Sequence, residues 1–193
     1  MTAIISIVIA YLLGSLSTSI ILSKALKTAD PRTQGSGNAG ATNVLRILGK
    51  QQAIIVLIGD ILKGAIAVWI AHLLHVRGFM LGIVGLAAVI GHVYPLYFKF
   101  KGGKGVATAI GVTIALSFIS GILMAAAWLA VAFALRYSSL ASLISVILAP
   151  IFLLIFSHAS YFIPSVLIAL LIIWLHKQNI DRLRNKTEGK IQF

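Results

Sequence analysis

The chain has 193 residues, of which 60% are hydrophobic and only 10% are charged, and its mean hydropathy is +1.04. Soluble domains carry about 25% charged residues, so this composition indicates an integral membrane protein, and the length predicts a single domain over residues 1–193. The net charge of +12 favours anionic lipid headgroups and anionic substrates over nucleic acid as partners, and the lack of cysteine excludes disulfides and thiolate chemistry.

The first apolar run extends from Ala3 to Leu22 and is long enough to cross a bilayer as a helix. No Lys or Arg precedes it, so the basic region of a cleavable signal peptide is missing. Lys24 and Lys27 follow it. By the positive-inside rule, we expect this helix to begin outside the cell and to end in the cytoplasm.

Basic residues gather in three polar segments that predict the remaining topology. Residues 24–50 contain five Lys or Arg, residues 99–104 contain three and residues 177–190 contain five, out of 16 in the chain. The positive-inside rule places all three segments in the cytoplasm, the last as a loop that leads to a cytoplasmic carboxyl terminus. The active site is then expected at the cytoplasmic face.

Between these segments, helices are expected at 54–75 and 79–98, joined by an outer turn at Arg77-Gly78, and then at about 106–119, 121–135, 140–156 and 161–176. The predicted fold class is therefore an all-α polytopic membrane bundle with seven spans. The alternative has five spans, with two long tilted helices after Lys104. The last four helices are shorter than the usual 17–25 residues, which implies a thinned or partly submerged bundle.

The first polar segment runs from Gly35 to Arg46 and combines the features of a phosphate site. Its glycines let a ligand approach the backbone, its hydroxyl and amide side chains supply hydrogen bonds, and Arg46 offers a bidentate fork. A helix beginning near Ala41 would add the partial positive charge of its amino end. The candidate ligand-binding residues are Ser36, Gly37, Asn38, Gly40, Thr42, Asn43 and Arg46. The alternative is a flexible solvated loop.

The second polar segment, Phe100 to Thr108, is rich in glycine and lysine but lacks the spacing of a nucleotide-binding P-loop, and no strand precedes it. We expect Lys104 to bind an anion, with a helix starting just after it. Lys99 and Lys101 are expected to anchor headgroups, and the alternative is that the whole segment does so. The candidate substrate-binding residues are Gly102, Gly103, Gly105 and Thr108.

Ionisable residues inside predicted spans are energetically costly and are usually paired or functional. Asp60 and Lys63, three residues apart, can pair with each other or orient the first polar segment. His92 is a candidate proton carrier or hydrogen-bonding strut. The internal glycines are expected to permit close helix packing; they are Gly82, Gly85 and Gly91.

Taken together, Gly35–Arg46, His92 with Gly102–Thr108, and the pattern His176…Asn179…Arg182-Leu183…Glu188 resemble the bacterial acyl-phosphate:glycerol-3-phosphate acyltransferases. The resemblance covers essentially the whole chain. It departs at Leu16-Ser17, where a proline is common, at Lys177, where arginine is usual, and at Lys186, where glycine is common; these affect the expected shape of the third loop most.

The resemblance implies transfer of a fatty acyl group from acyl phosphate to the 1-hydroxyl of sn-glycerol 3-phosphate, which yields lysophosphatidic acid and inorganic phosphate. It implies a bacterial inner-membrane enzyme of phospholipid synthesis that needs no cofactor, metal or obligatory protein partner. The implied catalytic residues are Ser36, Arg46, Lys104 and His176, and Asn179 joins the substrate-binding set. The implied supporting residues are Asp60, Lys63, His92, Ser142, Arg182 and Glu188.

Direct acyl transfer is the expected mechanism, because the sequence has no cysteine, no G-x-S-x-G elbow and no H-x-x-x-x-D motif. The general base is either His176 or an oxygen of the donor's own phosphate. Two alternatives from other classes are an organic-phosphate transporter and a non-catalytic lipid-binding protein. The lack of an internal repeat disfavours the transporter, and the Gly, Ser and Asn residues of the first segment disfavour the lipid-binding protein.

Overall fold

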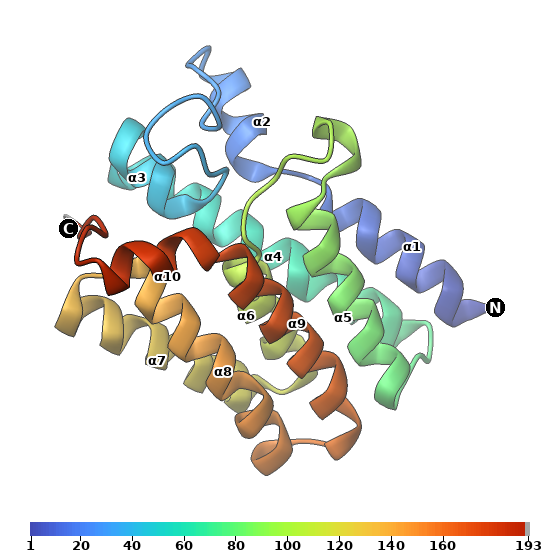
Figure 1. Cartoon of the computed structure of the whole chain (residues 1–193). Helices are drawn as coiled ribbons and strands as arrows, with labels where there is room; N and C mark the ends of the chain where they lie inside the picture. The colour runs from blue at the N-terminus through green and yellow to red at the C-terminus, as the bar shows by residue number, and fades with distance from the viewer. Residues whose placement is uncertain (192–193) are drawn as a thin grey trace.

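The computed structural model describes residues 1–191, and every regular element in that range is a helix (Figure 1). The first half contains α1 (Thr2–Gly14), α2 (Thr18–Ala25), α3 (Ala41–Leu48), α4 (Lys50–Leu73), α5 (Gly78–Val93) and the short 3₁₀ helix η1 (Leu96–Phe98). The second half contains α6 (Val106–Leu116), α7 (Phe118–Leu135), α8 (Ser138–Phe156), the 3₁₀ helix η2 (Ala159–Tyr161), α9 (Phe162–Leu175) and α10 (Lys177–Arg184). The all-helical fold class is thus confirmed for these residues.

An apolar helix lies on each of the seven predicted runs, but their lengths differ. The helix α4, the continuous stretch Gly78–Phe98, and the helices α7 and α8 are each long and apolar enough to cross a membrane. The pairs α1–α2 and α9–α10 would raise the number to six if each bent pair is one span, and α6, with 11 residues, is shorter than a span. The count of seven therefore stays a prediction.

The first apolar run is broken into two helices, whereas one helix was expected. A bend of 41° separates α1 from α2. Ser15 and Leu16 close the last turn of α1 through N–H bonds to the carbonyls of Tyr11 and Leu13, and Ser17 is extended. The carbonyl of Leu16 is then free to accept a bond of 2.8 Å from Lys63 Nζ on α4. The break therefore gives the buried ammonium of Lys63 a backbone acceptor.

The third polar segment is also more regular than expected. Residues 177–184, predicted as part of a loop, form α10, which turns away from α9 by 59°. His176 lies at the bend, where its N–H bonds to the carbonyls of Ile172 and Ile173 finish α9. The bend lays α10 across the end of the bundle, in contact with α8 (Figure 1).

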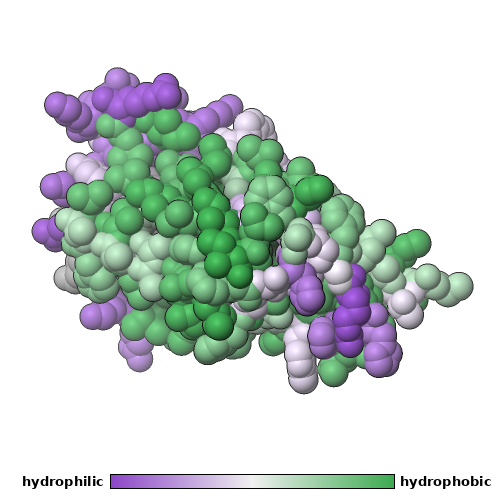
Figure 2. Space-filling view, turned by 90° about the horizontal axis from the view of Figure 1, so that it is seen from below, coloured by the Kyte–Doolittle hydropathy of each residue, from purple (hydrophilic) through white to green (hydrophobic). Residues whose placement is uncertain are grey.

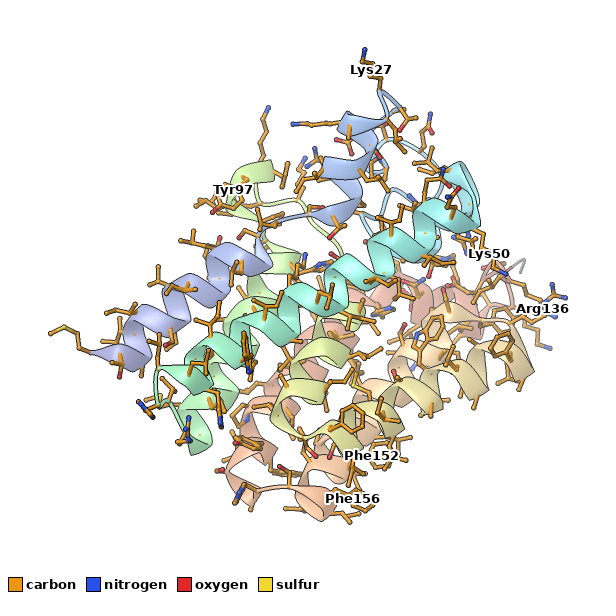
Figure 3. The ribbon with its side chains drawn as sticks, turned by 180° about the vertical axis from the view of Figure 1, so that it is seen from behind. Lys27, Lys50, Tyr97, Arg136, Phe152 and Phe156 are labelled. Atoms are coloured by element: carbon orange, nitrogen blue, oxygen red, sulfur yellow. The ribbon has the colours of Figure 1, made fainter. Side chains whose placement is uncertain are left out.

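The surface separates polar ends from an apolar middle. Figure 2 shows hydrophobic residues covering most of one face, with hydrophilic residues at its margins. In Figure 3, Lys27, Lys50 and Arg136 lie toward one end of the molecule, and Phe152 and Phe156 lie at the opposite end. This distribution fits a bundle that crosses a bilayer.

Glycines bring the helices that surround the site into close contact. A Cβ on Gly64 of α4 would collide with the carbonyl oxygen of Thr108 on α6, and one on Gly111 of α6 would collide with that of Ile61 on α4. A Cβ on Gly91 of α5 would likewise collide with the carbonyl oxygen of Tyr11 on α1. Such contacts confirm the expected packing role of Gly91 and draw α6, whose first turn faces the site, tightly against α4.

Candidate active site

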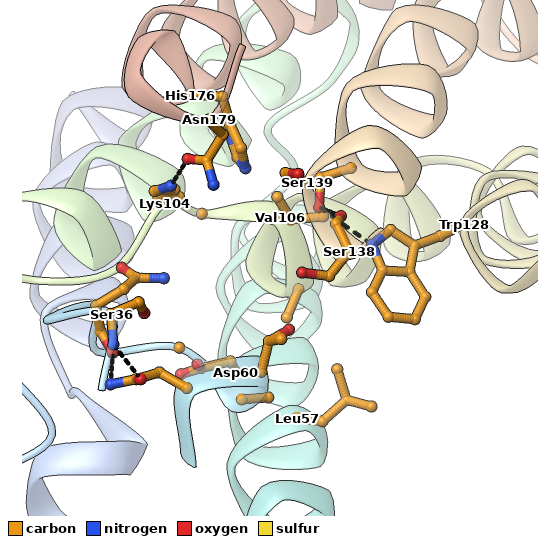
Figure 4. Close-up of a pocket in the computed structure, with 18 of the residues that line it drawn as sticks. Ser36, Leu57, Asp60, Lys104, Val106, Trp128, Ser138, Ser139, His176 and Asn179 are labelled. Carbon is orange, nitrogen blue, oxygen red and sulfur yellow. Dashed lines mark hydrogen bonds between the residues drawn. The ribbon is translucent and has the colours of Figure 1, made fainter. Parts of the chain in front are cut away.

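A single cavity of about 650 Å³ joins the three polar segments at one end of the bundle (Figure 4). It is bordered by the segment before α3, by the helices α3, α4, α6, α7 and α8, and by the α9–α10 bend. Of the residues predicted from sequence, those that line it are Ser36, Gly37, Asn38, Gly40, Thr42, Asn43, Arg46, Asp60, His92, Lys104, Gly105, Ser142, His176, Asn179, Arg182 and Glu188. The fold therefore brings together groups that lie up to about 150 positions apart in the chain.

Lys104 stands at the centre of the polar end, in a chain of hydrogen bonds. Its ammonium donates to Asn179 Oδ1 on α10. The amide of Asn179 donates to Glu188 Oε1 at 2.7 Å, and Arg182 Nε donates to Glu188 Oε2 at 2.6 Å. Glu188 thus orients the amide of Asn179 so that its oxygen faces the lysine. In Figure 4 Lys104 and Asn179 face each other next to His176.

The electrostatics of this end suit an anionic ligand. Burial, with help from the charge of Arg182, lowers the pKa of Lys104 to about 8. Burial raises the pKa of Glu188, but hydrogen bonds to its carboxylate, including those from Asn179 and Arg182, outweigh this and lower it. Glu188 therefore stays ionised, yet it lies among the cations Arg46, Lys104 and Arg182, and the other carboxylate of the cavity, Asp60, is already paired with Lys63. The excess positive charge favours a phosphate.

His176 presents one ring nitrogen to the cavity. Its side chain is buried, and Nδ1 lies 2.8 Å from the carbonyl oxygen of Ile172, one turn back on α9. A carbonyl can only accept, so Nδ1 carries the proton and Nε2 of the neutral ring is an acceptor. Burial, followed by the charge of Lys104, lowers the pKa of His176 to about 4, which keeps the ring neutral at pH 7.

The first polar segment is organised by Asn43, which is itself almost fully buried. Its Nδ2 donates to the carbonyls of Pro31, Gln34 and Asn38 at 2.8–3.0 Å, and its Oδ1 accepts the N–H of Ser36 at 2.8 Å. These bonds use both ends of the amide. Asn43 therefore holds the loop, and the structure gives it no free group for the direct substrate contact expected from the sequence.

The exposed side chains of this segment border the cavity on the side opposite Lys104. The helix α3 begins at Ala41, as expected, with Gly40 as its N-cap in extended conformation. Arg46, on the last turn of α3, is exposed, and its Nη2 lies 3.4 Å from the carbonyl oxygen of Gly189. Ser36 is exposed and lines the cavity (Figure 4). Ser36 and Arg46 are therefore available to a ligand.

Asp60 of α4 lies at the polar end of the cavity, where side chains of α2, α4 and α5 approach its carboxylate. It forms an ion pair with Lys63 at 2.9 Å and accepts a hydrogen bond of 3.0 Å from Thr18 on α2. His92 Nδ1, on α5, lies 3.7 Å from the same carboxylate. Asp60 and His92 line the cavity and Lys63 does not. The predicted pairing of Asp60 with Lys63 is confirmed, and the cluster ties the broken first run to α4.

Three residues of the second polar segment lie outside the cavity wall. Gly102 and Gly103 donate their N–H groups to the carbonyls of Val93 and His92, and a Cβ on either would collide with atoms of His92. Thr108 is fully buried against α4, one turn into α6. The structure thus places these three residues in support of the site, where the sequence predicted substrate binding. Gly105, with φ of 89°, makes the turn into α6.

The other end of the cavity is apolar, and this part was not predicted from the sequence. Its wall is made by Leu57 and Ile61 of α4, Val106, Ala107 and Ile110 of α6, and Ala125, Trp128 and Leu129 of α7. Trp128 Nε1 donates to Ser142 Oγ at 3.1 Å, and Ser142 donates to the carbonyl of Ser138. Ser142 therefore fixes the indole ring that borders this end (Figure 4). Nothing marks these residues in a sequence where apolar helices are the rule.

The residues that could hold a metal are few. Within residues 1–191, no group of three or more His, Asp or Glu side chains lies close enough together to coordinate a metal ion. The polar end instead offers cations and amides, which are suited to oxygen anions.

Comparisons with known proteins agree on one family. A family model described as glycerol-3-phosphate acyltransferase matches residues 4–186. Glycerol-3-phosphate acyltransferases from Coxiella burnetii and Vibrio cholerae are 55% and 46% identical to the chain. The alignment covers all of both chains for the first, and 98% of this chain and 90% of the relative for the second.

Two crystal structures have the same fold. Both are of PlsY (YgiH), an integral membrane glycerol 3-phosphate acyltransferase, one in a glycerol 3-phosphate form and the other in a lysophosphatidic acid form. They are 40% identical to this chain, with TM-scores of 0.93 and 0.91, and the match covers 100% of this chain and 96% of theirs.

Proposed function

The chain belongs to the glycerol-3-phosphate acyltransferase family, and we propose that the acyl donor of this membrane enzyme is a fatty acyl phosphate. The hydroxyl oxygen at position 1 of sn-glycerol 3-phosphate attacks the acyl carbonyl carbon, and the bond from that carbon to the phosphate oxygen breaks. The products are lysophosphatidic acid and inorganic phosphate. This is the first acylation of bacterial phospholipid synthesis, and the site faces the cytoplasm.

The observation that carries the proposal is the two-part cavity. Its polar end presents Arg46, Lys104 and Arg182 to oxygen anions, and its apolar end is lined by aliphatic side chains and Trp128. An acyl phosphate has one anionic end and one apolar tail, and it matches this shape. Leu57 and Leu129 line the apolar end and are 39% and 48% exposed, so this end is open to a lipid tail.

The resemblance of the third motif suggests that glycerol 3-phosphate would lie beside His176 and Asn179. Lys104 and Asn179 would bind its phosphate, whereas Ser36, Asn38 and Arg46 would bind that of the donor. The phosphate leaving group is a weak base and needs little acid catalysis. Charge neutralisation and alignment of the hydroxyl therefore supply most of the rate enhancement.

The hydroxyl proton has two available acceptors. His176 offers the lone pair of Nε2, since Nδ1 is committed to Ile172, and the departing phosphate offers its own oxygen. The low pKa of His176 makes it a weak base in the empty site, and two bound phosphates would raise that pKa. His176→Gln retains a hydrogen-bond acceptor but cannot take the proton, so substantial activity in that variant would assign the proton to the phosphate.

The test of the proposed function uses purified protein in detergent with labelled glycerol 3-phosphate. We expect labelled lysophosphatidic acid with acyl phosphate and none with acyl-CoA free of acyl phosphate. Detergent has no sealed compartments, so product formation also excludes obligatory transport. Turnover with acyl-CoA alone would contradict the proposed donor and leave the family assignment intact.

A further inference from the structure

Residues 187–191, called here the C-terminal strap, cross the polar end of the cavity after α10. The N–H of Thr187 bonds to the carbonyl of Arg182 at 2.8 Å, which turns the chain back. Thr187, Glu188 and Gly189 then form part of the cavity wall. In Figure 1 the C-terminal end lies at the end of the molecule formed by α10 and the α7–α8 turn.

The strap is anchored at Ile191. Its N–H donates to the carbonyl oxygen of Arg136 at 2.6 Å, and Arg136 Nε donates back to the carbonyl oxygen of Ile191 at 3.3 Å. The Ile191 side chain is only 3% exposed and packs with Ala132 of α7 and Ala141 of α8. Leu45 of α3 and Trp128 of α7 pack against the same cluster. The anchor therefore touches three helices that carry walls of the cavity.

The anchored strap in turn holds groups assigned to the substrates. The carbonyl of Gly189 lies 3.4 Å from Arg46 Nη2, and Leu45, which precedes Arg46, packs in the anchor cluster. Glu188 receives hydrogen bonds from Asn179 and Arg182. Asn179 then accepts from Lys104. A strap released at Ile191 would remove an acceptor from Arg46 and the partner that orients Asn179.

We propose that Ile191 and Arg136 are positioning residues for acyl transfer, which anchor the C-terminal strap so that Arg46 and the Lys104–Asn179 pair face the substrate phosphates. The expected effect on kinetics rests on the proposed function, whereas the docking of the strap does not. Neither residue lines the cavity, so each would act through the strap.

The docking itself is tested by thiol accessibility in the folded protein, because the chain has no cysteine of its own. Ile191→Cys and Lys190→Cys are neighbours in sequence, but residue 191 is buried and residue 190 is exposed. We expect a maleimide to label Ile191→Cys at least about tenfold more slowly than Lys190→Cys, and Arg136→Ala to reduce the difference. Equal labelling rates for Ile191→Cys and Lys190→Cys, each made with Arg136 intact, would overturn the proposal, whether or not the protein is active.

The kinetic test separates positioning from folding. We expect Ile191→Asp to raise the KM for glycerol 3-phosphate by about tenfold with a smaller change in kcat and in melting temperature, because the phosphate ligands remain but are misaligned. Ile191→Leu should restore the KM. Lys190→Ala, which removes only the contact of its ammonium 5.6 Å from the Tyr137 ring, is the matched control.

Two results would overturn the positioning role. One is a wild-type KM in a folded Ile191→Asp protein. The other is a rise in KM of equal size in Lys190→Ala. If the wild-type protein makes no lysophosphatidic acid, the proposed function fails, and the labelling experiment still decides whether the strap is docked.

Discussion

Arg46 and Lys104 are the cations that approach the cavity from opposite sides. In the absence of substrate each has only a weak or neutral partner at its charged end, a carbonyl for Arg46 and an amide oxygen for Lys104. Within residues 1–191 neither forms a direct ion pair, so both can bind phosphate. We expect Arg46→Ala and Lys104→Ala to fold but to lose about 2–4 kcal/mol of transition-state stabilisation, or roughly 30- to 1000-fold in kcat/KM.

The matched controls for these variants are Lys99→Ala and Lys101→Ala. Both lysines are exposed and neither lines the cavity, although they share the loop and the charge of Lys104. Arg46→Lys should also be impaired, because an ammonium cannot reproduce the bidentate fork. If all four alanine variants lose activity equally and modestly, the loops act as a diffuse basic surface and the specific phosphate site is wrong.

The pH dependence of substrate capture should follow Lys104. Its pKa is lowered from the ordinary lysine value to about 8, so the ammonium is present below that pH and is lost as the pH rises through it. We expect kcat/KM, which reports the free enzyme, to fall by up to about tenfold per pH unit above pH 8. In Lys104→Arg this decline should vanish, even if the overall rate is lower. An identical decline in that variant would assign the titration to another group.

Individual residues show where sequence reasoning succeeds. Ser36, Arg46, Lys104 and His176 all reach the cavity, because charged and polar groups in an apolar chain have few other roles. Asn43 and Gly102, which the sequence predicts to bind substrate, instead donate hydrogen bonds to backbone carbonyls that only the fold brings close. A sequence shows which groups can form hydrogen bonds, but not which of them remain free after folding.

Among the elements, α6 is a short apolar helix of 11 residues that packs closely against α4. Its Gly111 faces the carbonyl of Ile61 on α4, with no space for a methyl group. We expect Gly111→Ala to destabilise the fold by about 1–3 kcal/mol, because α6 must move away from α4. The melting temperature in detergent should fall by several degrees. Ala115→Leu, at an exposed position of the same helix, should leave it unchanged; a similar fall in both variants would indicate that enlarging α6 is harmful anywhere.

Most helices and the breaks between them were predictable, but two local features were not. Clusters of Lys or Arg and short Gly or Ser interruptions lie near the observed ends of α4, α5 and α7. The break at residues 15–17 and the helix α10 escaped prediction, because both depend on partners elsewhere. Lys63 captures the Leu16 carbonyl at the break, and Glu188 bridges to Asn179 and Arg182 on α10.

On the scale of the whole molecule, the contact between the strap and the α7–α8 turn bears on the number of spans. Residues 187–190 are the end of the third basic segment, and the next residue, Ile191, bonds to Arg136. With seven spans, Arg136 lies on the cytoplasmic side, where the carboxyl terminus is expected. With five, the turn at Arg136 lies on the opposite side from that terminus, and a bilayer separates the two residues. The contact therefore favours seven spans.

Cysteine labelling in intact cells tests that topology, and the lack of native cysteine removes any background. The reporter positions Thr33, Arg77, Lys101, Arg136, His158 and Thr187 are all exposed, so protection at any of them reflects its side of the membrane or its depth in it. With seven spans, an impermeant maleimide added outside should label Arg77→Cys and His158→Cys only, and permeabilisation should expose the other four. With five spans, Arg136→Cys would be labelled from outside and His158→Cys would be protected within a long helix. Outside labelling at Thr33→Cys, Lys101→Cys or Thr187→Cys would overturn the cytoplasmic placement of the polar segments, and with it the proposed access of glycerol 3-phosphate from the cytoplasm.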